Sequence, residues 1–88
     1  MKSLTRYWFR FEKLPSASAV NLGCGVTAHG NEDALALLKE RVFKKPTLPT
    51  ILNWVADVDI SKLDSKHVLP NLGNPVLRGV WFPQGFDG

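Results

Sequence analysis

The sequence predicts an α+β fold: a two-layer sandwich in which one amphipathic helix packs on a mainly antiparallel four-stranded sheet. Four short segments have the alternation or the aromatic and β-branched content of strands, and one segment has helical periodicity. The predicted order is strand, strand, helix, strand, strand, and the order of strands within the sheet stays open. The 88 residues fit one domain over residues 1–83, followed by a loose tail at 84–88.

The first two strands are expected at residues 5–12 and 22–28, separated by a loop at 14–21 that contains Pro15. Aromatic and charged side chains alternate along the first strand, which gives it two unlike faces. The face expected to pack in the core carries Tyr7, Phe9 and Phe11. The face expected to be exposed to solvent carries Arg6, Trp8, Arg10 and Glu12. Gly23 and Gly25 loosen the start of the second strand.

A helix is expected over residues 31–43. Asn31 is the expected N-cap, and the acidic residues Glu32 and Asp33 lie in the first turn, where the helix dipole favours negative charge. The apolar stripe at helical spacing consists of Ala34, Leu35, Leu38 and Val42, widened by Leu37. Pro46 and Pro49 prevent the helix from continuing.

The third strand is expected at residues 51–60, with Trp54, Ala56, Val58 and Ile60 inward and Asp57 and Asp59 outward. Ser61 and Asp64 match a capping box and predict one short helical turn near 62–68, which Pro70 limits. Residues 71–75 form a turn, and the last strand is expected at 76–82.

Composition excludes several classes of protein. The formal charge is +3, and no apolar run reaches the roughly 18 residues of a membrane span. Because charges follow closely on the start of the chain, no signal peptide is expected, and the predicted location is the cytoplasm. The one cysteine excludes an internal disulfide framework and a cysteine-rich zinc site.

Two sets of residues offer groups for catalysis or metal binding. Cys24 with His29 or His67 could form a nucleophilic pair, but a single cysteine is more often a small buried apolar residue. Asp57 and Asp59, with Asp64 or His67, could hold Mg²⁺, but aspartates alternating along a strand more often form a solvated face. We therefore expect a non-enzymatic protein with no cofactor and no metal.

Binding is the function that the residues favour. Aromatic residues and arginine anchor protein interfaces, and the expected binding residues are Arg6, Trp8, Arg10 and Trp81. If one face of the sheet is open, these residues predict binding to a protein partner or, in a homodimer, to a second copy. The role would be regulatory or toxin-neutralising. The other reading is that loops 14–21 and 61–75 cover the two tryptophans.

Nucleic-acid binding is the alternative function. Arg6, Trp8 and Arg10 on one strand face could contact phosphates and stack on bases. A basic cluster would add to them, formed by Lys39, Arg41, Lys44 and Lys45. The helix dipole gives that cluster a second explanation, because it favours cations at the C-terminal end of a helix.

Three stretches of the chain carry a resemblance. They are Tyr7-Trp-Phe-Arg-Phe11, then Gly23-Cys-Gly-Val-Thr-Ala28 leading into Asp33-Ala-Leu-Ala-Leu-Leu38, then His67-Val-Leu-Pro-Asn-Leu-Gly-Asn-Pro-Val76 ending in Arg78-Gly-Val-Trp-Phe-Pro83. Over roughly two-thirds of the chain this set resembles a family of small uncharacterised bacterial proteins. The resemblance implies a bacterial, stand-alone, cytoplasmic domain, and it carries over no catalytic or binding residue.

Overall fold

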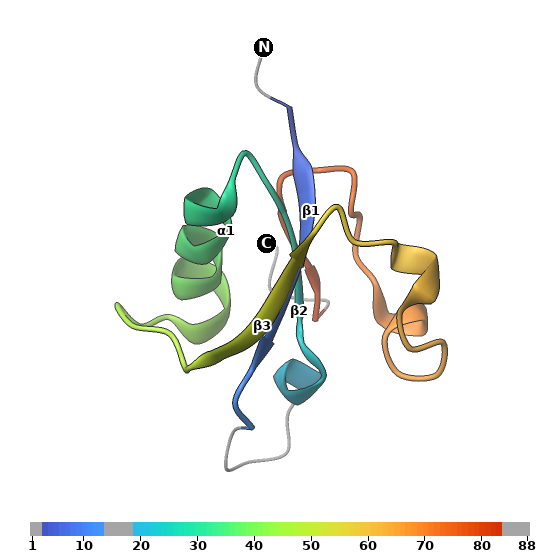
Figure 1. The fold of residues 1–88 in the computed structure, drawn as a ribbon, viewed down its shortest axis with the longest axis horizontal. Coiled ribbons are helices and arrows are strands. Elements are labelled where there is room, and N and C mark those ends of the chain that lie inside the picture. Colours follow the sequence, from blue (N-terminus) through green and yellow to red (C-terminus); the bar gives the residue numbers. More distant parts are fainter. Residues whose placement is uncertain (1–2, 14–18, 84–88) are drawn as a thin grey trace.

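The computed structural model describes residues 3–13 and 19–83 and shows the predicted α+β fold (Figure 1). Four antiparallel strands form one sheet in the order β3-β1-β2-β4. The strands are β1 Thr5–Phe11, β2 Cys24–Ala28, β3 Ile51–Ala56 and β4 Gly79–Phe82. The helix α1 spans Asn31–Leu37 and continues as π-helical turns over Leu38–Phe43, which together match the predicted span. The predicted tail at 84–88 and residues 14–18 of the predicted loop lie outside the described residues.

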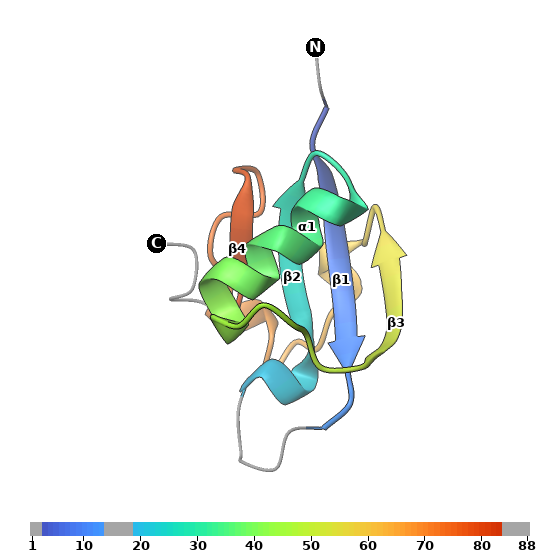
Figure 2. The same ribbon diagram turned by 90° about the vertical axis from the view of Figure 1, so that its left-hand side faces the viewer.

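The strand order requires the chain to cross the sheet twice. β2 and β3 lie on opposite sides of β1, and α1 makes the first crossing over one face. β3 and β4 then form the two edges of the sheet, so residues 57–78 must pass from edge to edge. They do so on the face opposite α1, so that the sheet has the helix on one side and a largely irregular segment on the other (Figures 1 and 2).

The helix side of the sheet holds the main core. The predicted inward rings Tyr7, Phe9 and Phe11 are all buried there. Ala34, Leu37 and Leu38 of the helix and its π-helical extension are also buried, whereas Leu35 and Val42 are only partly buried at the margin. The other buried members of this cluster are Cys24, Val26, Ala28 and Val80.

The start of α1 differs from the prediction. Gly30 is the N-cap and makes no side-chain bond, while Asn31 is the first helical residue. Asp33 takes part of the capping role, because its Oδ2 accepts the backbone N–H of His29 at 3.0 Å. The chain before the helix is therefore fixed by a carboxylate inside the first turn.

The third strand ends at Ala56, four residues earlier than predicted. Asp57 adopts a left-handed backbone with φ of 55°, which breaks the two-residue alternation of the strand. Val58 and Ile60, predicted on the helix side, consequently pack in the cluster on the opposite face. The last strand is also shorter than predicted, since Val76 and Leu77 lie in the preceding loop, 61% and 63% exposed.

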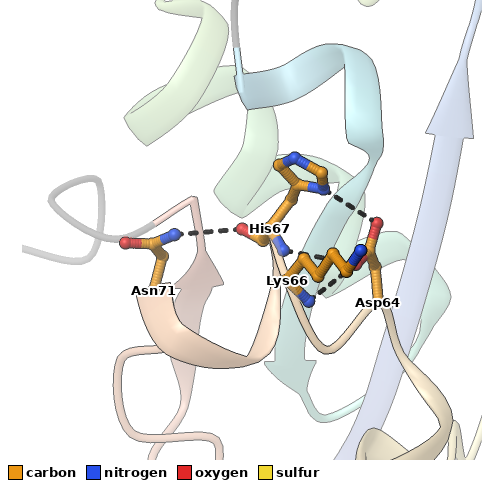
Figure 3. A network of polar contacts seen from close by, with 4 residues as sticks. All are labelled: Asp64, Lys66, His67 and Asn71. Atoms are coloured by element: carbon orange, nitrogen blue, oxygen red, sulfur yellow. Dashed lines mark hydrogen bonds and ion pairs between the residues drawn. The ribbon is translucent and has the colours of Figure 1, made fainter.

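Side-chain caps shape the crossing segment, although not the cap predicted at Ser61. Asp59 Oδ1 accepts bonds from the backbone N–H and the hydroxyl of Ser61, at 3.1 and 2.6 Å, and precedes a 3₁₀ turn at Ile60–Lys62. Asp64 accepts the backbone N–H groups of Lys66 and His67 at 2.8 and 3.2 Å (Figure 3). A single turn lies within the expected range 62–68, since the backbone N–H of Val68 donates to the Asp64 carbonyl at 3.1 Å. A second 3₁₀ turn, Leu69–Asn71, follows and contains Pro70.

Candidate protein interface

Trp8 and Trp81 lie together inside the protein. Their exposed fractions are 8% and 1%, and their ring centroids are 5.9 Å apart. Phe82 packs on Trp8 at 5.5 Å, and Val68 of the crossing segment is buried against this group. Partly buried residues complete this second cluster, namely Val58, Ile60, Leu63 and Leu72. The prediction that the Trp8 face of the sheet is exposed to solvent is therefore wrong. The alternative, that a loop segment covers this face, describes the structure.

Gly25 in β2 and Gly23 just before it explain how the two indole rings fit against this strand. A Cβ at Gly23 would lie 2.6 Å from the Trp8 ring, and one at Gly25 would lie 2.4 Å from the Trp81 ring. Gly23 also has φ of 128°, a backbone conformation that L side chains rarely adopt. The Gly23-Cys24-Gly25 stretch therefore makes room for the second cluster.

Arg6 and Arg10 flank Trp8 on the same face of β1, but both are exposed whereas Trp8 is buried. Arg6 holds the loop before β4, because its Nε donates to the carbonyl oxygen of Pro75 at 3.3 Å. The hydroxyl of Thr27 donates to the same oxygen at 2.6 Å. Of the four predicted binding residues, Arg6 and Arg10 are therefore at the surface, and Trp8 and Trp81 form buried packing.

Cys24 does not form a nucleophilic pair with His29 or His67. Cys24 is fully buried in the helix-side core, and burial raises the pKa of its thiol to about 12. His29 follows five residues later along an extended strand, which places it roughly 16 Å away, far beyond hydrogen-bond reach. His67 directly precedes Val68, which packs in the cluster of Trp8 and Trp81 on the opposite face.

His67 and the nearby carboxylates serve local structure. The Nδ1 of His67 lies 3.1 Å from Asp64 Oδ2, and Asn71 Nδ2 donates to the His67 carbonyl at 3.0 Å (Figure 3). Hydrogen bonds, first from the Lys66 backbone, lower the pKa of Asp64, and the bond from the Ser61 hydroxyl lowers that of Asp59. Over residues 3–13 and 19–83, no three His, Cys, Asp or Glu side chains group as a metal site would require.

The basic cluster lies where the helical segment ends. Lys39, Lys44 and Lys45 line a shallow open hollow of about 520 Å³, together with Ala36, Glu40 and Pro46. The segment ends at Lys44, whose left-handed φ of 54° turns the chain toward β3. Cations here are favoured by the carbonyl end of the helix, and Glu40 places a negative charge among them.

Exposed apolar side chains gather on β3 instead. Leu52, Trp54 and Val55 are 61%, 48% and 50% exposed. Trp54 opposes Phe9 across the strands, and its ring lies against Tyr7 and Phe9 with centroids 6.1 and 6.2 Å away. α1 packs over β2 and β4, so β3 extends beyond the helix and one part of the Trp54 ring stays open (Figure 2). The prediction that Trp54 is a core residue is thus only half right.

The two edges of the sheet are unlike. The outer edge of β4 is met by the crossing segment, since the backbone N–H of Gly73 donates to the Trp81 carbonyl at 2.7 Å. Along β3, no strand or loop among the described residues pairs with the outer edge. Sheet edges are usually protected by charges, prolines, β-bulges or a covering element. β3, with the sequence Ile-Leu-Asn-Trp-Val-Ala, has neither charge nor proline. Its pairing with β1 is regular over 53–56, and a register shift leaves Leu52 without an opposed residue. This edge, defined by Ile51–Ala56, is the candidate interface.

Sequence reasoning missed this site because its exposure depends on strand order. The uncharged stretch is evident in the sequence, but an uncharged strand is equally typical of the middle of a sheet.

In the described part of the chain, no helix is both long and apolar enough to cross a membrane. Comparisons with protein-family models, with curated proteins and with solved structures found no match for this chain.

Proposed function

We propose that the protein is a small, non-enzymatic interaction module that binds an extended segment of a partner protein along β3. The observation that supports this proposal is the open, uncharged edge, which carries three large apolar side chains about half exposed or more. Addition of a strand to an exposed sheet edge is a common mode of peptide recognition. We expect this role in the cytoplasm.

Binding at β3 would combine backbone and side-chain contacts. Alternate residues of an edge strand direct their N–H and C=O groups away from the sheet, where an incoming strand can pair with them. Side chains of that strand would then meet Trp54 on the helix side and Val55 on the other side, since Val55 opposes Trp8. Trp54 is the expected anchor, because half-buried aromatic rings often dominate interface energies.

The experiment is a selection of displayed ten-residue peptides on the immobilised protein, followed by affinity measurements on the enriched peptides. We expect enriched peptides to be rich in β-branched and aromatic residues, as strands are. Leu52→Lys should abolish their binding, because it places a charge on the edge. Leu77→Lys is the matched control: Leu77 is 63% exposed against 61% for Leu52 but lies outside the sheet. Failure to enrich any peptide, or equal loss in both variants, would contradict the proposal.

Nucleic-acid binding through Arg6, Arg10 and the basic cluster stays a prediction. In this structure the Trp8 ring is covered, so stacking on bases would have to come from elsewhere. The measurement is binding to mixed single- and double-stranded oligonucleotides at low salt, in wild type and in Lys44→Gln with Lys45→Gln. Binding that falls steeply with salt and weakens in the double variant would replace the interaction proposal with this one.

A further inference from the structure

We propose that the strand that pairs with β3 is β3 of a second copy, in antiparallel orientation, so that two sheets join into one sheet of eight strands. This inference rests on the proposed function, because it names the partner of the same edge. The paired surface would be identical in both copies, as it is in any two-fold dimer. Each copy brings the same uncharged, proline-free strand, so pairing places no like charges against one another.

Charges at the C-terminal end of β3 favour the antiparallel arrangement. Asp57 and Asp59 directly follow the strand, and both are exposed. Parallel pairing would bring these carboxylates of the two copies side by side, where they would repel each other. Antiparallel pairing places them at opposite ends of the paired strands.

Trp54 fits the centre of the joint. With the two-fold axis at this residue, Trp54 of each copy faces Trp54 of the other on the helix side, because opposed residues of antiparallel strands share a face. The row of rings that runs from Tyr7 and Phe9 to Trp54 within one copy would then continue into the next. The offset of α1 toward β4 leaves that side of β3 uncovered (Figure 2).

The first test is sedimentation velocity on the full chain, from low micromolar to near-millimolar concentration. A joint of one strand pair is small, so we expect a concentration-dependent equilibrium between monomer and dimer. Leu52→Lys should keep the protein monomeric, and Leu77→Lys should leave the dimer unchanged. Far-UV circular dichroism identical to that of wild type would show that Leu52→Lys still folds. A monomer at every concentration, or a dimer that only Leu77→Lys disrupts, overturns the proposal.

The second test determines the register of the two paired β3 strands by disulfide formation. With the axis at Trp54, Asn53 of one copy opposes Val55 of the other, and opposed Cβ atoms lie about 4.5–5.5 Å apart, close enough for a disulfide. Asn53→Cys mixed with Val55→Cys should cross-link under mild oxidation, far faster than either variant alone. Cys24 provides a silent background because it is buried. A dimer that shows no such preference overturns the register centred on Trp54.

The two proposals fail in different ways. A monomer that still binds selected peptides, with the binding lost in Leu52→Lys, would overturn self-pairing and support the interaction module. A monomer that binds no peptide would overturn both. A dimer sensitive to Leu52→Lys that competes with peptide binding at high protein concentration would support both, since one edge cannot hold two strands.

Discussion

At the scale of single residues, the closest fit in the molecule is between glycine and tryptophan. A Cβ at Gly25 would lie 2.4–2.5 Å from three atoms of the Trp81 ring, which is itself fully buried and has no room to withdraw. We therefore expect Gly25→Ala to destabilise the protein by about 3 kcal/mol, the upper range for overpacking a core. Urea denaturation followed by far-UV circular dichroism measures this change.

Gly30→Ala is the control for this substitution. A Cβ at Gly30 meets nothing within 4 Å, and its φ of 178° is extended backbone that any residue adopts. The free energy of unfolding should fall by about 1 kcal/mol at most, because alanine is a poorer N-cap than glycine but meets no steric contact here. Equal effects of the two substitutions would show that contact with Trp81 does not explain the requirement for glycine.

Cys24 gives a second prediction at this scale. Burial raises the pKa of its thiol to about 12, and the thiolate is the reactive form, so the native protein should resist alkylation at neutral pH. In urea, the rate of reaction with iodoacetamide should rise together with the unfolded fraction. Fast modification under native conditions, with circular dichroism unchanged, would instead support a catalytic role for this cysteine.

At the scale of elements, an ion pair fixes the start of α1 to the approach of β4. Arg78 Nε and one terminal nitrogen donate to the two carboxylate oxygens of Asp33, at 2.9 and 2.5 Å. The Arg78 hydrogen bond is the main cause that holds the pKa of Asp33 well below its usual range, and the His29 backbone N–H adds to it. Because the folded-state pKa is depressed, the pair stabilises the fold above the unfolded value near 3.9 and loses this effect as pH falls below it.

Asp33→Asn tests this dependence. The melting temperature of the variant should lie below that of wild type at neutral pH, and the gap should close as pH falls below about 4. Glu32→Gln, at an exposed position in the same first turn, is the control and should show a smaller gap at neutral pH. A gap for Asp33→Asn that persists unchanged into acid would mean that the carboxylate charge is not what stabilises this contact.

The elements also show which features of the fold could be predicted from the sequence. The helical span and the inward rings of β1 were predictable, because periodicity records which face is buried. The end of β3 was not, since alternation continues past Asp57 in the sequence while the backbone turns left-handed there. Exposure of Trp54 was equally hidden, because it follows from the place of β3 at the sheet edge rather than from any residue in the strand.

At the scale of the whole molecule, the strand order explains why a chain of this size has two apolar clusters. The link between the two edge strands must cross the sheet, and its crossing converts the Trp8 face into a second buried layer. This layer was foreseen only as an alternative, because the sequence does not fix which strands lie at the edges. Both clusters contain residues of β1 and β4, so neither can lose its packing without disturbing the sheet on which the other rests.

Val68→Ala tests this coupling. Val68 is 2% exposed and belongs to the cluster of Trp8 and Trp81, so the smaller side chain should destabilise the protein by about 2 kcal/mol through lost burial and a cavity. If the molecule unfolds as one unit, tryptophan fluorescence and far-UV circular dichroism should keep coincident transitions in urea, both shifted to lower concentration. Tryptophan fluorescence, to which Trp8 and Trp81 contribute together with Trp54, would instead change before far-UV circular dichroism if the crossing segment could detach while the helix side stayed folded. That outcome would make the Trp8 face available to a partner after all, whereas coincident transitions would leave β3 as the proposed binding surface of the native protein.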